Sequence, residues 1–191
     1  LSFSVGSLFR PTDASTLAVS FARAARNPAL EELYFFGEHA GNLQFEIGNE
    51  DLESEVAYGR DVSYRVRLPR VSAEVTYFNN TIDNYIFRNQ ISEDEFEDRF
   101  PDAGHGHGEE HDAHGEEHED DGHGEEEYPF VEFIGRDARL QGVEVHADID
   151  VAAGLHLELG LDTVRGTQRD GGDPLPRIPP VRFTGGVRYH L

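Results

Sequence analysis

Residues 143–161 read VEVHADIDVAAGLHLELGL, and apolar and polar side chains alternate along nearly all of this stretch. A period of two is typical of β-strands whose two faces meet different environments. Ala152–Gly154 interrupt the pattern with small residues that suit a tight turn. The stretch therefore predicts an antiparallel β-hairpin with one apolar face and one polar face.

The same alternation recurs in five further segments, which brings the number of predicted strands to seven. These segments are Phe3–Phe9, Thr16–Ala24, Val56–Leu68, Val71–Tyr77 and Val181–Tyr189. The connections alternate in length: Arg10–Ser15, Leu68–Arg70 and Ala152–Gly154 are short, whereas Arg26–Glu53, Asn89–Glu127 and Thr167–Pro179 are long. Short turns at one end and long loops at the other are typical of outer-membrane β-barrels.

A soluble sandwich or a lipocalin-like barrel is the alternative fold for such strands. The polar face carries Glu, Asp, Arg, His and Ser, and burying that many charges unpaired costs several kcal/mol each. A water-filled lumen therefore suits this face better than a dry core. Seven strands would leave two sheet edges whose backbone N–H and C=O groups lipid cannot hydrogen-bond. We therefore expect residues 1–191 to have an all-β fold and to form part of a larger transmembrane barrel.

The amino-acid composition excludes several kinds of site and partner. The chain has no cysteine, which excludes disulfides and thiolate metal sites, and no run of about 20 apolar residues that could form a membrane helix. Residues 93–127 hold 17 of the 38 acidic residues and 1 of the 16 basic residues, so most of the net charge of -22 is local. Such an acidic segment predicts a disordered loop and argues against nucleic acid as a partner.

A series of short motifs resembles the C-terminal barrel half of TonB-dependent outer-membrane receptors. The motifs are Arg23–Asn27 with Pro28 and Glu31–Tyr34, Gly48–Glu55, Tyr77–Ile86, Ala138–Glu144 and Leu175–Pro180, in the order expected for the family. Glu50 and Ser54 stand where the family's G-N-P-x-L-x-P-E signature has proline. We found no plug domain or TonB box, and Tyr189–Leu191 lack the usual terminal aromatic.

The resemblance implies energy-coupled uptake of a scarce nutrient: an iron–siderophore, haem, cobalamin or a metal ion. It also implies outer-membrane lipid around the barrel, and a TonB-type energy-coupling protein that acts through regions missing from these 191 residues. Within the family, zinc-uptake receptors carry outer loops rich in His, Asp and Glu, and this sequence resembles that branch.

Residues 104–124, GHGHGEEHDAHGEEHEDDGHG, carry the residues that point to a metal, and we call them the histidine tract. Imidazole suits zinc, copper and nickel, and carboxylates add charge and further ligands. Six glycines in 21 residues argue against one rigid tetrahedral site and favour several interchangeable sites. The candidate ligands are His105, His107, His111, His114, His118, His123, Glu110, Glu117 and Asp112.

No catalytic residue and no catalytic cofactor are expected. Residues His107–His111 and His114–His118 match the H-x-x-E-H protease pattern, but that pattern works on a helix and glycine-rich repeats produce it by chance. Zn²⁺ is the expected bound ion, with Ni²⁺, Cu²⁺ or an iron chelate as alternatives. His146, His156 and His190 on the polar faces of strands could line a translocation path, and His39 could lie in an outer vestibule.

Three functions remain open at this point. The first is a receptor that takes up zinc captured by the histidine tract. The second is a receptor for an iron–siderophore or another organic chelate, in which the tract is incidental. The third is a surface protein that buffers metal and transports nothing.

Overall fold

The computed structural model describes residues 1–39, 41–101, 103 and 128–190, and it consists of two compact units. Unit 1 comprises Leu1–Pro28, Leu52–Phe87 and Gly135–Leu191, and unit 2 comprises Ala29–Asp51 and Arg88–Ile134. Strands β6 and β7 contribute residues to both units. Among the described residues, no helix is long and apolar enough to span a membrane.

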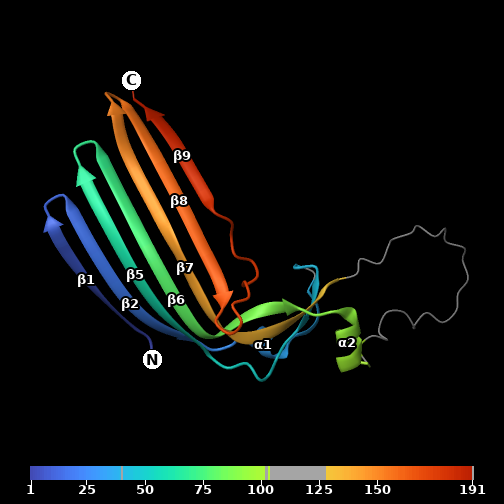
Figure 1. Cartoon of the computed structure of the whole chain (residues 1–191). Helices are drawn as coiled ribbons and strands as arrows, with labels where there is room; N and C mark the ends of the chain where they lie inside the picture. The colour runs from blue at the N-terminus through green and yellow to red at the C-terminus, as the bar shows by residue number, and fades with distance from the viewer. Residues whose placement is uncertain (40, 102, 104–127, 191) are drawn as a thin grey trace, which may run out of the picture. The chain divides into compact units, whose positions relative to one another are not determined.

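Unit 1 is an antiparallel sheet of seven strands, which run side by side in Figure 1. Their order across the sheet is β1, β2, β5, β6, β7, β8, β9, which follows the chain apart from the two short strands of unit 2. The strands are β1 (Phe3–Thr12), β2 (Ser15–Arg26), β5 (Glu55–Leu68), β6 (Val71–Gln90), β7 (Phe130–Ala152), β8 (Leu155–Gln168) and β9 (Arg182–Tyr189). All seven predicted strands are therefore present.

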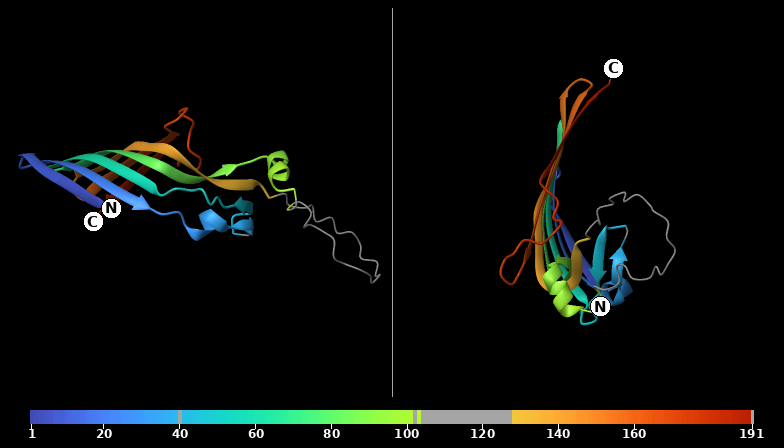
Figure 2. Two further views of the ribbon diagram at one scale, coloured as in Figure 1. Left: turned by 90° about the horizontal axis from the view of Figure 1, so that it is seen from below. Right: turned by 90° about the vertical axis from the view of Figure 1, so that its right-hand side faces the viewer.

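The connections between these strands confirm the predicted alternation in length. Two residues separate β1 from β2, β5 from β6 and β7 from β8, whereas the connections after β2, β6 and β8 are long. Viewed edge-on, the seven strands form one curved layer (Figure 2). Short turns at one end and long connections at the other confirm the predicted portion of an antiparallel β-barrel.

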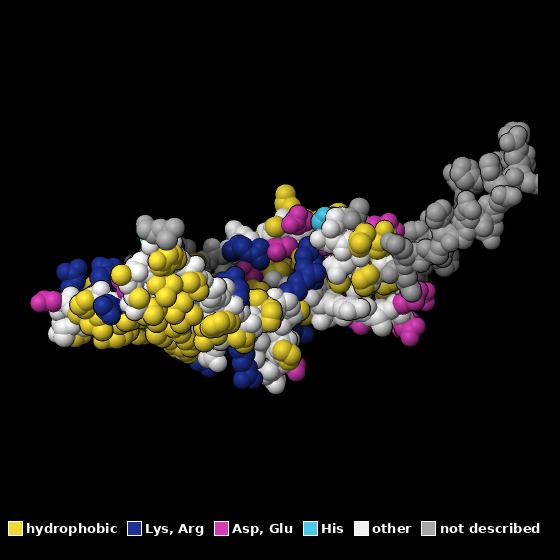
Figure 3. Space-filling model, turned by 90° about the horizontal axis from the view of Figure 1, so that it is seen from above, with side chains coloured by type: hydrophobic (Ala, Val, Ile, Leu, Met, Phe, Trp, Pro, Cys, Tyr) yellow, Lys and Arg dark blue, Asp and Glu magenta, His cyan; other side chains and the backbone are white. Residues whose placement is uncertain are grey.

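The register of the strands separates two faces of this sheet. On the apolar face, Val62 lies opposite Tyr77 and Ala147 opposite Leu159, and on the polar face Arg65 lies opposite Glu74. Large apolar side chains on all seven strands are exposed, and in the space-filling view they gather over one area of the sheet (Figure 3). An apolar area of this extent on a sheet fits contact with lipid.

Unit 2 contains structure that the sequence did not predict. The long connection after β2 holds helix α1 (Leu30–Tyr34) and the hairpin of β3 (Phe36–His39) and β4 (Gln44–Ile47). Strand β4 also pairs in parallel with the first residues of β7, where Phe45 lies opposite Phe130. These elements are four or five residues long, which is too short for a periodic pattern to reveal them.

The Gly48-Asn49 motif has a clear structural reason in unit 2. A Cβ at Gly48 would lie 2.7 Å from the carbonyl carbon of Leu33, so only glycine allows the chain to approach α1 this closely. Asn49 donates a hydrogen bond from Nδ2 to the carbonyl of Phe133 at 3.2 Å, and its Oδ1 accepts from the backbone N–H of Asp51 at 3.0 Å. The motif therefore fixes the path of the chain after β4.

The predicted disordered loop at 93–127 begins differently in the structure. Helix α2 (Glu93–Arg99) starts at Ser92, whose Oγ accepts a hydrogen bond from the backbone N–H of Glu95 at 3.2 Å. Acidic residues in the first turn and Arg99 in the last turn both suit the helix dipole. The buried side chain of Phe96 holds this helix against the core of unit 2.

Candidate functional site

The nine predicted metal ligands lie outside the described residues. They are His105, His107, His111, His114, His118, His123, Glu110, Glu117 and Asp112. The structure does describe the residues on both sides of the histidine tract, up to Ala103 and from Tyr128 onward. Those flanking residues belong to unit 2.

An apolar cluster in unit 2 joins the two flanks of the histidine tract. Its buried members are Ile47, Ile91 and Phe96, and Phe45, Phe100, Ala103 and Phe130 pack against them. The rings of Phe96 and Phe130 are stacked with centroids 4.0 Å apart. In the backbone, the N–H of Ile91 donates to the carbonyl of Phe130 at 3.1 Å, and the N–H of Phe45 donates to the carbonyl of Pro129 at 3.1 Å. The described residues on the two sides of the tract thus belong to one small core.

A buried carboxylate lies in the same unit. The Glu46 side chain is 3% exposed, and its Oε1 accepts a hydrogen bond from Asn42 Nδ2 at 2.8 Å. His39 Nδ1 lies 3.2 Å from Oε2, and Arg88 Nε lies 3.0 Å from Oε1 in ionic contact without hydrogen-bond geometry. The sequence predicted a role for His39 but missed Glu46, Asn42 and Arg88, because nothing local shows that these residues meet.

The surroundings of Glu46 keep it ionised. Burial by itself would raise the pKa of the Glu46 carboxyl, but the hydrogen bonds from Asn42 and His39 together with the charge of Arg88 outweigh burial and hold this pKa below its ordinary value. Because the pKa is lowered by folding, the ionised carboxylate stabilises unit 2 above the pKa of the unfolded chain. That stabilisation is lost as the pH falls through the lower, folded pKa.

Replacing Glu46 with Gln should therefore loosen unit 2. The neutral amide leaves the Arg88 guanidinium without its partner charge, and we expect a loss of about 1–3 kcal/mol in the local stability of the β3–β4 hairpin. Faster hydrogen exchange of β4 amides at pH 7, with a smaller difference from the native protein below about pH 4, is the expected result. Glu50→Gln, an exposed turn substitution in the same unit, should leave exchange unchanged. Equal protection of β4 in both variants would contradict this role of Glu46.

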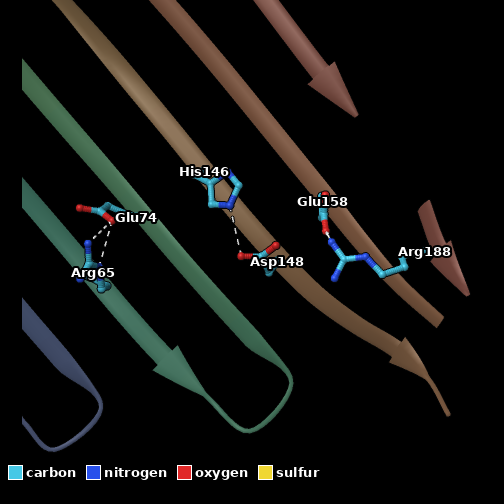
Figure 4. Close-up of polar contacts among 6 residues, drawn as sticks. All are labelled: Arg65, Glu74, His146, Asp148, Glu158 and Arg188. Atoms are coloured by element: carbon cyan, nitrogen blue, oxygen red, sulfur yellow. Dashed lines mark hydrogen bonds and ion pairs between the residues drawn. The ribbon is translucent and has the colours of Figure 1, made fainter. Parts of the chain in front are cut away.

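The polar face of unit 1 carries charged groups in register across five strands. Arg65 on β5 contacts Glu74 on β6 at 2.5–2.9 Å, His146 and Asp148 on β7 lie 3.2 Å apart, and Arg188 on β9 contacts Glu158 on β8. Figure 4 shows these side chains on one face of the sheet. They are at least a third exposed, so each pair adds little stability in water. A solvent-exposed polar face of the sheet with paired charges fits the inner side of a water-filled barrel.

Two of the three histidines predicted on the polar faces of strands lie near each other, and one of them, His190, directly follows β9 instead of lying in it. His156 Nδ1 lies 2.5 Å from Asp150 Oδ1, and the His156 and His190 rings have centroids 5.5 Å apart. His146 contacts only Asp148 among these groups. Within the part of the chain that the structure describes, no three His, Asp or Glu side chains converge in a way that could hold a metal ion. A role of these histidines in translocation remains a prediction.

These features, a sheet with an apolar face and a polar face and with short turns opposite long connections, define a barrel wall. A family model described as "TonB dependent receptor-like, beta-barrel" matches residues 1–191, and the chain belongs to this family. The predicted family and the predicted outer-membrane location are thereby confirmed, since barrels of this family are outer-membrane proteins. No curated relative matches the chain in sequence.

Solved structures of transport receptors share the fold. The copper transporter OprC is similar with a TM-score of 0.70 at 15% identity over 97% of this chain. The hemophore receptor HasR from Serratia marcescens, in complex with HasA and heme, has a TM-score of 0.63 at 16% identity over 97% of this chain. The siderophore receptor PirA from Acinetobacter baumannii has a TM-score of 0.62 at 15% identity over 100% of this chain. This chain spans 24%, 29% and 26% of those three proteins, respectively.

Proposed function

We propose that this chain forms part of the barrel of an outer-membrane receptor that takes up a transition-metal ion, with zinc as the favoured cargo. The single observation that carries the proposal is the histidine tract, in which six imidazoles stand among carboxylates in the connection between β6 and β7. That connection is one of the long ones, and long connections of outer-membrane barrels face the outside of the cell. The tract therefore stands where external metal is first met.

The chemistry of the tract suits capture followed by release. Neutral imidazole nitrogens bind zinc, copper and nickel, while Glu110, Glu117 and Asp112 offer oxygen ligands and attract cations. Several alternative ligand sets of moderate affinity raise the local metal concentration without holding one ion tightly. A receptor that passes its cargo inward needs this property, because tight binding at the entrance would slow release.

Transport rather than catalysis is the activity of this proposal. The metal is cargo, no catalytic residue or catalytic cofactor is assigned, and the energy for uptake comes from a TonB-type coupling protein. The apolar cluster around Phe96 and Phe130 holds both flanks of the tract, which supports a role for it as an appendage of the receptor. The charged polar face of unit 1 supports a hydrated path on the inner side of the sheet.

An organic iron chelate is the second candidate cargo. The fold is shared with siderophore receptors such as PirA, and their barrels supply the same kind of scaffold. Copper is a further candidate ion, because imidazole binds it well and the copper transporter OprC has this fold. A surface protein that only buffers metal would need neither the coupling protein nor transport.

Replacing the side chains of residues 104–124 in the full receptor separates zinc from an iron chelate as the cargo. We expect cells that depend on this receptor to grow several-fold more slowly under zinc limitation when the tract is replaced by a Gly/Ser linker of equal length. Growth under iron limitation should not change. Impaired growth under iron limitation alone would favour the iron-chelate receptor, and unchanged growth under both limitations would defeat the role assigned to the tract.

A further inference from the structure

Four arginines lie on the apolar face of unit 1, at the end of the strands that leads to the long connections. Arg60 on β5 lies opposite Asn79 on β6, and Gln141 on β7 lies opposite Arg165 on β8. The side-chain amides of Asn79 and Gln141 are 3.2 Å apart, which links the two pairs into one row. Arg139 lies two positions along β7 from Gln141, and Arg23 on β2 lies opposite Tyr58, two positions along β5 from Arg60. We call Arg23, Arg60, Arg139 and Arg165 the arginine row.

The arginine row borders the lipid-facing area directly. Two positions nearer the short turns, the same face carries Val62 opposite Tyr77 and Val143 opposite Thr163. Beyond them it stays apolar as far as Leu68, Val71 and Val151, next to the turns. In the space-filling view, dark blue side chains lie beside the yellow area (Figure 3). By register, the arginines at paired positions of this face on β2, β5, β7 and β8 thus stand at the edge on the side of the long connections.

The charges of the row are not compensated by the chain itself. Arg65, Arg182 and Arg188 on the polar face each contact a carboxylate. In contrast, none of the four row arginines makes an ion pair within the described part of the chain. Arg23 donates to the carbonyl of Leu1, and its guanidinium carbon lies 5.7 Å from the centroid of the Tyr58 ring. Arg139 Nε and Nη2 each lie 2.9 Å from the side-chain oxygen of Asn79 when the Asn79 amide is turned so that its oxygen faces these donors.

Acidic residues on the same face do not neutralise the charges of the arginine row. Among the described strand residues of the apolar face, the carboxylates are Asp83 and Asp137, and both contact Arg169. Arg60, Arg139 and Arg165 are exposed, and their long side chains can lie along apolar surface while their charged ends reach the polar boundary. Because no carboxylate of the described chain pairs with these arginines at the edge of the apolar face, an anion from the surrounding membrane can bind them.

We propose that the arginine row is a binding site for phosphate-bearing lipid headgroups of the outer leaflet. Guanidinium groups bind phosphate through paired, charge-assisted hydrogen bonds. Neighbouring strands lie about 4.8 Å apart, so Arg60 and Arg165, three strands apart, are separated by about 14 Å with Arg139 between them. That span accommodates two phosphate groups of one headgroup or of two neighbouring lipids. Lipid binding at the arginine row is independent of which cargo the receptor carries.

The test measures lipid binding to the purified, delipidated full-length receptor in a neutral detergent. Lipid A with two phosphates is the probe, and the same lipid without phosphate and inorganic phosphate are the comparison ligands. For R60Q/R139Q/R165Q we expect binding of the phosphorylated lipid to weaken about tenfold or more, because hydrogen bonds to charged groups are lost. Binding of the dephosphorylated lipid should not change. R60K/R139K/R165K keeps the positive charges but loses the paired guanidinium hydrogen bonds, so it should bind the phosphorylated lipid more weakly than the native receptor and more tightly than R60Q/R139Q/R165Q.

A second triple variant controls for net charge. R67Q/R70Q/R136Q removes three positive charges away from the row and should bind the phosphorylated lipid like the native receptor. Equal weakening in both triple variants would overturn the assignment, as would equal binding of the lipid with and without phosphate. Complete competition by inorganic phosphate at the lipid's own concentration would also overturn it, since the site would then recognise free anion. Thermal unfolding of each variant shows whether the barrel is intact.

Discussion

Gly142→Ala is expected to impair assembly of the barrel wall far more than Gly135→Ala, the other glycine-to-alanine change available in β7. A Cβ at this position would lie 2.0 Å from the carbonyl oxygen of Thr163 and 2.6 Å from the nearest ring carbon of Phe78. Because one of these contacts is with backbone, relief requires a shift of the β7–β8 pairing as well as of the Phe78 ring. Overpacking of this kind typically costs about 1–3 kcal/mol, and occasionally more.

Gly135→Ala is the matched control for this prediction. It lies on the same strand, and its Cβ would meet no atom closer than 3.7 Å, which is an ordinary contact. We expect several-fold less folded Gly142→Ala receptor in the outer membrane, and a lower temperature of unfolding in detergent. The Gly135→Ala receptor should behave like the native one. Similar yields and unfolding temperatures for the two variants would show that the close approach at Gly142 does not limit assembly.

Replacing all six tract histidines with alanine should nearly abolish zinc binding to the purified receptor. The variant changes His105, His107, His111, His114, His118 and His123. Calorimetric titration at pH 7.4 should show a loss of more than about 100-fold in affinity, since losing only the groups that hydrogen-bond to metal ligands and orient them already costs about 10–100-fold. Between about pH 7 and pH 5, binding to the native tract should weaken, because protons compete with metal for imidazoles whose ordinary pKa is about 6.5.

A companion variant tests whether histidine or negative charge carries the binding. Glu110→Gln, Glu117→Gln and Asp112→Asn together remove three candidate oxygen ligands but keep every imidazole. We expect this variant to bind zinc more weakly than the native receptor and much more tightly than the variant without histidines. If the two variants lose equal affinity, the tract acts as a diffuse anionic segment, and the assigned ligand set is wrong.

The strands of unit 1 could be predicted because each one spans two environments. Alternation along residues such as Val143–Val151 reports directly which face meets lipid and which meets water, and short turns next to it fix the pairing of neighbours. The structure extends several of these strands beyond the predicted ends, as in β6, where the alternation fades after Tyr77 but pairing continues. Pairing beyond that point is decided by the neighbouring strands.

Unit 2 could not be predicted in the same way. Strand β4 owes its place to a parallel pairing with Phe130–Glu132, residues far along the chain, and no local pattern encodes that partner. The acidic composition of 93–127 hid helix α2, although the Ser92 cap and the Phe96/Phe100 spacing were present in the sequence. Glu46 reads as an exposed acid in isolation and becomes a buried one only when Asn42, His39 and Arg88 meet it.

The predicted metal ligands rest on chemistry rather than on geometry. Among the described residues, the group most similar to a metal site in composition is His156, His190 and Asp150 in unit 1, and these three side chains do not converge on one point. The proposed cargo therefore rests on the chemistry of the tract's side chains alone. The described residues on its two sides, Phe96, Phe100 and Ala103 before it and Phe130 after it, share one apolar cluster.

Uptake of radioactive zinc is the most direct test of the central claim. Cells that express the native receptor or the variant without tract histidines would be compared at low external zinc, with and without a working TonB-type coupling protein. We predict rapid accumulation only in cells that have both the tract histidines and the coupling protein. Equal accumulation by the variant, or accumulation that does not require coupling, would contradict the proposal that the tract captures zinc for active transport.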